Sequence, residues 1–297
     1  MKALYPDQFK SDQLKSNRPK RWNSALVCLF SVTVGLAAIH LTLTWKTDNT
    51  SLWFNSIVFG GFITSLVLDK RHCLRSWHEK AGPLSSLLGC TLLAVILLKS
   101  RLLTGGNFLN VYPFASAIGL VLLGFGFSGL IRFWKEITLL FFLGIPRVIL
   151  DPIVDISLLT AHASNIILSL TGWPVSREGV WIRLPHGSIE VYSGCDGTVL
   201  ITYLVGVAIL FLLCIPIKGW KRFTVPFAAI LIGFIVNSFR VVMMALMVNA
   251  SNEVGFFYWH HGQGSHLFSM MGTVILGLFY CFLLEQNNSK SGDAKET

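Results

Sequence analysis

Long apolar runs separated by short polar stretches occupy most of the chain. A helix needs about 20 residues to cross the ~30 Å hydrocarbon core of a membrane. Runs of roughly that length lie at positions 24–44, 52–68, 84–98, 111–131, 137–150, 197–216, 223–248 and 266–285. Two of them, 84–98 and 137–150, reach spanning length only with flanking residues. The pattern predicts an all-α, polytopic transmembrane bundle of about eight spans.

The segment between the fifth and sixth runs has a different pattern. Residues 153–170 are apolar but contain Asp155, His162 and Asn165. We expect an amphipathic helix at the outer membrane surface, although a ninth span stays an alternative. The next stretch reads WPVSREGVWIRLPHGSIEVYSG, and it alternates between apolar and polar residues on both sides of PHGS. This alternation predicts a small β-hairpin before the sixth span.

Lysine and arginine residues indicate how the spans are oriented, because cytoplasmic loops carry an excess of them. Clusters occupy the N-terminal segment and the loops after the second, fourth and sixth runs. Their members are Lys2, Lys10, Lys15, Arg18, Lys20, Arg21, Lys70, Arg71, Arg75, Lys80, Arg132, Lys135, Lys218, Lys221 and Arg222. Eight alternating spans place all of these inside, and Lys99 and Arg101 are the exception. Both termini are therefore expected to be cytoplasmic.

Composition excludes several other classes of protein. Hydrophobic residues make up 53% of the 297 residues and charged residues 13%, whereas soluble domains average about 25% charged residues. The net charge of +9 does not indicate nucleic-acid binding, because the basic residues form short clusters between apolar runs. Membrane lipids are the expected surroundings. With no repeat or linker, the chain divides into a polar tail (1–22), one membrane domain (23–286) and a C-terminal tail (287–297).

Cys195 is the first of three chemically informative positions. It lies between two glycines in YSGCDGTVLITYLVG, at the outer end of the sixth run. Small neighbours leave the sulfur accessible, and a following helix N-terminus favours a thiolate. A buried structural cysteine is the alternative. The six cysteines show no C-x-x-C spacing, so we expect neither a disulfide framework nor a zinc site.

Arg240 is the second such position, in the run NSFRVVMMALMV of the seventh span. Asn237, three residues earlier, shares its helix face. At 1.5 Å per residue Arg240 lies roughly 25 Å along the span, near the outer side. An arginine at membrane depth is costly and can hold a thiolate, an oxyanion or a carboxylate. An arginine that extends to the outer headgroups is the alternative.

A histidine-rich segment, FYWHHGQGSHLFSMMG, is the third. It contains His260, His261 and His266 in the outer loop and first turn of the last span, where histidine can move protons near neutral pH. Solvated loop histidines and a metal site are alternatives. The glycines and the absence of a neighbouring carboxylate argue against a metal, so no metal or cofactor is expected.

The alternation of the spans places Cys195, Arg240 and His260 at one outer face, which is the arrangement of a nucleophilic cysteine site. At these residues the sequence resembles the exosortase/archaeosortase family of membrane transpeptidases, and its cyanobacterial branch most. The family motifs are Cys-small-Gly, N-x-x-R and H-x-x-x-G, which correspond here to 195–197, 237–240 and 260–264, with Phe268 as a frequent aromatic. The stretch before Cys195 resembles G-[IW]-P-V-x-R-x-G-x-x-I-x-L-P-x-G.

The resemblance covers about residues 130–285, and it departs from the family at Asp196, where the family usually has serine. A carboxylate there raises the pKa of the thiol unless a cation offsets it, or it orients His260. His266 is the runner-up to His260 as the catalytic histidine.

The resemblance implies an enzyme of the bacterial plasma membrane that acts near the outer face. Its substrates would be exported proteins with a C-terminal sorting signal: a Pro-Glu-Pro-like motif, one transmembrane helix and a basic tail. Cys195 would form a thioester, His260 would move the proton, and Arg240 would stabilise negative charge. A glycolipid or exopolysaccharide component would be the acceptor.

Other classes of function remain open on the sequence alone. A transporter would explain an intramembrane arginine, although interrupted helices in corresponding halves are not evident. A serine intramembrane protease would need a dyad at Ser265 or Ser269, and no G-x-S-x-G motif is present. A non-catalytic assembly protein would tolerate the loss of Cys195.

Overall fold

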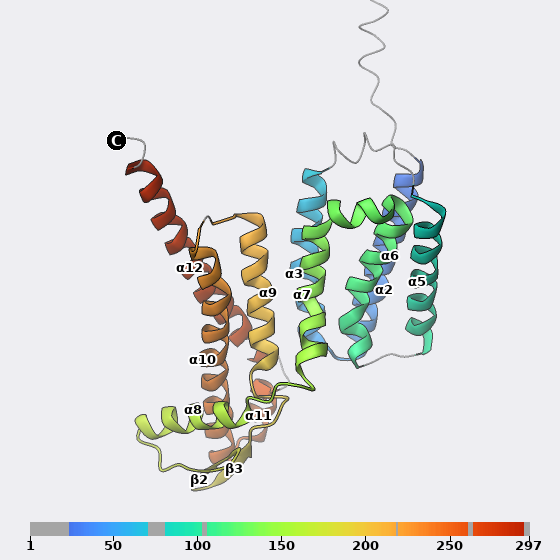
Figure 1. The fold of residues 1–297 in the computed structure, drawn as a ribbon. Coiled ribbons are helices and arrows are strands. Elements are labelled where there is room, and N and C mark those ends of the chain that lie inside the picture. The colour runs from blue at the N-terminus through green and yellow to red at the C-terminus, as the bar shows by residue number, and fades with distance from the viewer. Residues whose placement is uncertain (1–23, 71–80, 103–105, 218, 261–263, 294–297) are drawn as a thin grey trace, which may run out of the picture.

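A computed structural model describes residues 24–70, 81–102, 106–217, 219–260 and 264–293. It is a helical bundle with a small sheet at one end (Figure 1). The long helices are α2 (Ser24–Lys46), α3 (Thr50–Asp69), α5 (Pro83–Leu102), α6 (Asn107–Arg132), α7 (Trp134–Leu150), α9 (Thr198–Cys214), α10 (Lys221–Asn249) and α12 (Gly264–Asp293). Each of the eight apolar runs corresponds to one of these helices.

The prediction of a polytopic helical bundle is confirmed. Within the described ranges, six helices are long and apolar enough to cross a membrane. The other two long helices, α7 and α9, have 17 residues each, which is about 26 Å of helix and close to the minimum for a span. The polar N-terminal tail, Arg71, Arg75, Lys80 and Lys218 lie outside the described residues, and the division into tails and one membrane domain stays a prediction.

Figure 1 shows two groups of long helices. Helices α2, α3, α5, α6 and α7 stand together, while α9, α10 and α12 form a second group, and α7 packs against α9. The end of the bundle where α7 ends and α9 begins is called the site end below. At the opposite end, Lys70 Nζ pairs with Glu136 Oε1 at 2.7 Å, and Lys135 Nζ donates to the Leu213 carbonyl at the end of α9.

Helix α8 (Ser157–Leu170) lies crosswise over the site end rather than alongside the spans (Figure 1). Its buried face includes Leu168 as well as hydroxyl groups, and His162 is on its exposed side. The buried face carries small and polar residues, among them Thr160 and Ser164, and their hydroxyls donate to the carbonyls of Asp196 and Ser238. Large apolar side chains point outward: Leu158, Leu159, Ile166 and Leu170. The amphipathic prediction therefore holds, with the polar face toward the protein.

The predicted hairpin is present, and a third strand joins it. Strands β1 (Ser176–Glu178), β2 (Trp181–Leu184) and β3 (Gly187–Glu190) form an antiparallel sheet in the order β1-β2-β3. Ile182 pairs with Ile189 across β2 and β3. Both side chains are buried in a cluster with α8 and the last turns of α10, because alternate strand residues face one side. The sheet thus anchors the segment that leads to Cys195.

Candidate active site

Cys195 lies in the loop between β3 and α9, and three elements fix that loop. Its own N–H donates to the Tyr192 carbonyl at 2.8 Å. Asn237 Nδ2 of α10 donates to the Cys195 carbonyl at 2.9 Å. Thr160 Oγ1 of α8 donates to the carbonyl of Asp196 at 2.6 Å. The thiol is therefore buried, with 4% of the residue exposed, in a loop of defined geometry.

Gly197 is required where this loop turns into α9. Its φ of 103° is in the left-handed region, which side chains with a Cβ rarely adopt. An added Cβ would also lie 2.8 Å from Asn237 Nδ2. Any other residue here would displace the amide that holds the carbonyl of Cys195, which explains the glycine two positions after the cysteine.

His260 ends the short helix α11 (Glu253–His260) and faces the thiol. Its Nε2 is 3.6 Å from Cys195 Sγ and 3.3 Å from Tyr192 Oη. The imidazole stacks on Phe256, one turn earlier in α11, with ring centroids 5.1 Å apart. A thiol and an imidazole at this separation can exchange a proton with little movement.

Arg240 binds the main chain at the histidine. Its Nη2 donates to the His260 carbonyl at 2.7 Å, and its Nε donates to the Trp259 carbonyl at 3.3 Å. These are among the last carbonyls of α11, where a cation is favourable. Asn237 lies one turn before Arg240 on the same face, as the spacing predicts. Helix α10 thus holds the cysteine loop with one side chain and the histidine segment with another.

The environment of Cys195 keeps it a thiol at rest. Burial raises the pKa of Cys195, and the carboxylate of Asp196 adds to the increase; the hydrogen bond with the Tyr192 main chain and the charge of Arg240 act in the opposite direction. The net direction is upward. A base is therefore needed to form the thiolate, and His260 is in position to be that base.

Asp196 precedes Gly197, the N-cap of helix α9, and binds the first residue of that helix. Its Oδ1 accepts from the Thr198 N–H at 2.9 Å, and its Oδ2 accepts from Thr198 Oγ1 at 2.8 Å. The residue is 1% exposed, and a carboxylate at a helix N-terminus is a favourable cap. Thr198 thus contacts both carboxylate oxygens, and the alternative role of Asp196 in orienting His260 stays a prediction.

The second histidine candidate points elsewhere. His266 Nε2 contacts Thr50 Oγ1 at 3.1 Å, and its ring lies beside Phe54 of α3. Phe268 packs edge-to-face on Trp259, with centroids 5.6 Å apart, and so supports the histidine segment. The structure thus brings Cys195, Arg240 and His260 together, while His266 contacts α3.

The metal alternative depends in part on His261, which lies outside the described residues. Within the described ranges, no group of three or more His, Cys, Asp or Glu side chains forms a metal-ligand cluster.

Tyr192 is a site residue that the sequence analysis missed. Its phenol contacts His260, and burial followed by the proximity of Cys195 raises the pKa of Tyr192. It therefore remains a protonated donor beside the thiol. The available signal was its place at the end of the alternating segment, three residues before the cysteine.

A cavity of about 420 Å³ adjoins these residues. Its wall includes Tyr192, Gly197, Asn237, Arg240 and His260, and it extends to the turn between α2 and α3. The cavity is large enough for a few peptide residues. The nucleophile candidate thus lies beside a space that a substrate can enter.

Fold and site together define a multi-pass membrane protein with a cysteine–histidine pair held at one end of its bundle. The family model described as transmembrane exosortase (Exosortase_EpsH) matches residues 45–278. The chain belongs to this family, which is one of intramembrane sorting enzymes. The exosortase/archaeosortase resemblance is thereby confirmed at the level of the family.

A curated relative extends the match to archaea. Over 111 residues the chain is 26% identical to the probable archaeosortase E of Methanocaldococcus jannaschii. The aligned segment covers 37% of this chain and 56% of that protein, so the chain spans little more than half of the relative's length. No solved structure matches the chain.

Proposed function

We propose that the chain is a membrane-embedded cysteine transpeptidase that processes exported proteins. The observation that carries this proposal is the 3.6 Å separation of Cys195 Sγ and His260 Nε2 beside a cavity. The substrate would carry a Pro-Glu-Pro-like motif, a transmembrane helix and a basic tail at its C-terminus. The motifs around Cys195, Asn237 and His260 support the assignment to the cyanobacterial branch.

In the first half-reaction, Cys195 Sγ attacks the carbonyl carbon of the scissile peptide bond. His260 Nε2 accepts the thiol proton as the carbon–sulfur bond forms. When the tetrahedral intermediate collapses, the carbon–nitrogen bond breaks and His260 returns the proton to the leaving amine. The product is a thioester on Cys195, and the released fragment is the C-terminal helix with its tail.

In the second half-reaction, a hydroxyl or amine of a glycolipid or exopolysaccharide acceptor attacks the thioester carbonyl, and His260 Nε2 accepts the acceptor's proton as the new carbon–oxygen or carbon–nitrogen bond forms. When the carbon–sulfur bond breaks, His260 returns that proton to the Cys195 sulfur. Arg240 places its positive charge near the thiolate while it holds the main chain of His260. The Tyr192 hydroxyl is a donor for the oxyanion, because it lies beside both the thiol and the imidazole. Hydrogen-bond donors aimed at a developing oxyanion stabilise the transition state.

The basic clusters support an orientation with the site end at the outer face of a bacterial plasma membrane and both termini in the cytoplasm. A substrate helix in the same bilayer would then present its scissile bond at the depth of Cys195. Docking of that helix converts peptide cleavage into an oriented, nearly intramolecular step.

The test is processing of a tagged exported reporter with this C-terminal signal, co-expressed with the chain. Cys195→Ala and Cys195→Ser should abolish the shorter product, whereas Cys90→Ala, at an exposed position on α5, should leave it unchanged. Undiminished cleavage by both Cys195 variants would remove the cysteine from the nucleophile role and favour a non-catalytic assembly protein.

A further inference from the structure

A polar side chamber opens from the cavity at a distance from the cysteine. Its volume is about 30 Å³, and it lies between α3, α6, α7 and α9. Ser51, Asn55, Arg147, Val199 and Tyr203 line both spaces, so the two are continuous. Since one water needs about 10–15 Å³, the chamber has room for about two or three waters, which is about the size of a carboxylate.

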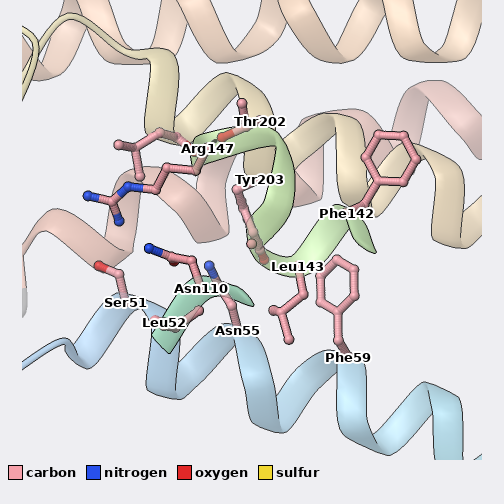
Figure 2. A pocket seen from close by; sticks show the side chains of 12 residues that line it. Ser51, Leu52, Asn55, Phe59, Asn110, Phe142, Leu143, Arg147, Thr202 and Tyr203 are labelled. Carbon is pink, nitrogen blue, oxygen red and sulfur yellow. Dashed lines mark hydrogen bonds between the residues drawn. The ribbon is translucent and has the colours of Figure 1, made fainter. Parts of the chain in front are cut away.

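The chamber is rich in hydrogen-bond donors and has no acidic lining. Figure 2 shows Arg147, Ser51 and the amides of Asn55 and Asn110 pointing into the same space. None of the twelve lining residues is Asp or Glu. The Arg147 Nε contacts Asp151 Oδ2 at 3.4 Å, and Asp151 does not line the chamber. Figure 2 shows the guanidinium at the same end of the pocket as Ser51 and the amide of Asn110.

Close packing of α6 on α7 fixes one wall. An added Cβ at Gly144 would overlap the main-chain carbonyl of Asn110. The glycine therefore allows α7 to approach α6 at the residue that precedes Arg147 by one turn. Asn110 is 5% exposed, and its amide is available to the chamber rather than to lipid.

The charges around the whole cavity favour an anion. Arg147 and Arg240 are the arginines of its wall, Asp48 is the acidic residue, and His260 and His266 complete the titratable set apart from two tyrosines. Arg240 already binds two main-chain carbonyls. Arg147 is thus the cation that is placed to meet a ligand.

Arg147 and the residues next to the nucleophile line one cavity. Gly194 precedes Cys195 and Gly197 follows it by two positions, and both line the cavity of about 420 Å³ that Arg147 also lines. A carboxylate on the substrate peptide can therefore reach Arg147 while the scissile carbonyl lies at Cys195.

We propose that Arg147, with Ser51, Asn55 and Asn110, forms a subsite that binds an acidic side chain of the peptide substrate near the scissile bond. This proposal rests on the proposed function, and it makes Arg147 a specificity determinant. The guanidinium binds the carboxylate by charge-assisted hydrogen bonds, and the small volume rejects larger anions.

The test measures binding separately from cleavage. The full-length Cys195→Ala variant in detergent micelles is titrated with two fluorescently labelled peptides that contain Pro-Glu-Pro or Pro-Gln-Pro. The glutamate peptide should bind about 10–100-fold more tightly. Adding Arg147→Gln should abolish this preference, and Arg147→Lys should restore part of it. Arg101→Gln, a matched charge removal at the exposed end of α5, should retain the preference.

Three outcomes would overturn the subsite. The first is that Arg147→Gln weakens the binding of both peptides equally, and the second is that the protein with Arg147 intact shows no preference for glutamate. The third is that Arg147→Gln loses affinity for a sugar phosphate but keeps its preference for the glutamate peptide. The last result assigns the chamber to the acceptor. Thermal unfolding midpoints report whether each variant is folded. Because the titration needs no chemistry, a preference for glutamate without any reporter cleavage would refute the transpeptidase and leave the subsite standing.

Discussion

Polar side chains in α2, α3 and α5 differ from those of α8 and α10 around the candidate site in how far along the chain they bond. In α2, α3 and α5, hydroxyl groups donate to carbonyls of their own helix four residues earlier: Ser31 to Val27, Thr33 to Leu29, Thr42 to Ala38, Thr64 to Gly60 and Thr91 to Leu87. In α8 and α10, polar side chains bond to segments 20–74 positions away, as in Ser164 to Ser238, Asn237 to Cys195 and Arg240 to His260.

This difference distinguishes polar groups that bond only within their own helix from polar groups that hold distant segments together. A hydroxyl that bonds to its own helix is neutral in lipid and fixes nothing beyond that helix. A bond between distant segments holds two parts of the chain in one arrangement, and its loss leaves a buried group unpaired. The first group does contain bonds between helices, such as His40 to Ser56 and Tyr112 to Leu36, but these do not reach the candidate site. The bonds of Thr160, Asn237 and Arg240 lead to the cysteine loop and to His260.

The largest effect is expected from His260 of α11, and His266 of α12 is the matched comparison. His260→Ala removes the base beside the thiol and should lower reporter processing by about 10²–10⁴-fold. His266→Ala removes a contact with Thr50 and should lower it by less than about tenfold. Processing rates in cells or proteoliposomes measure both. Equal losses would show that proximity to Cys195 does not identify the catalytic histidine.

A smaller effect is expected on stability, and it tests the comparison directly. Asn237→Ala removes the donor to the Cys195 carbonyl at a fully buried position, so it should lower the free energy of unfolding by about 1–3 kcal/mol. Thr64→Ala removes a bond within α3 at an exposed position and should change the free energy of unfolding by less than about 0.5 kcal/mol. Unfolding in detergent with increasing denaturant compares them. Similar losses of unfolding free energy in Asn237→Ala and Thr64→Ala would show that long-range bonds do not stabilise the protein more than local ones.

The smallest effect is a shift in the pH dependence of the thiol. The thiolate is the reactive form, and burial raises the pKa of Cys195. Alkylation of Cys195 should therefore rise with pH through a range above that of a free cysteine, about 8.5. Asp196→Asn removes a neighbouring negative charge and should move this rise to lower pH. The rate of iodoacetamide labelling of Cys195 is measured from about pH 6 to about pH 10, which is the range where thiols titrate. If the rise moved to higher pH in Asp196→Asn, the assigned effect of the Asp196 charge would be wrong.

Hydropathy predicted the helices because a membrane span leaves a continuous apolar run. It did not indicate which face of α8 is buried. The small polar residues Thr160 and Ser164 turn inward beside Leu168, while Leu158, Leu159 and Leu170 turn outward. Strand β1 was missed because its three residues, SRE, are all exposed and show no alternation.

Motif spacing predicted the residues of the candidate site but not all of their contacts. Cys195, Arg240 and His260 each belong to a short pattern, and the structure brings them together. The partners of Arg240 are main-chain carbonyls, which leave no trace in a sequence. Tyr192 and Arg147 stand alone, with no spacing pattern to mark them, so only their positions around the cavity reveal them.

The exposed leucines of α8 affect how a catalytic fragment of the protein could be prepared. Leu158 and Leu170 are 58% and 82% exposed, while the hydroxyls of the same helix are bonded to the loop and helix that carry the cysteine and asparagine. Removing membrane spans would not yield a water-soluble catalytic fragment, because α8, which holds the cysteine loop, exposes apolar side chains on its outer side. We therefore expect the protein to need detergent or a nanodisc that covers α8 as well as the membrane spans.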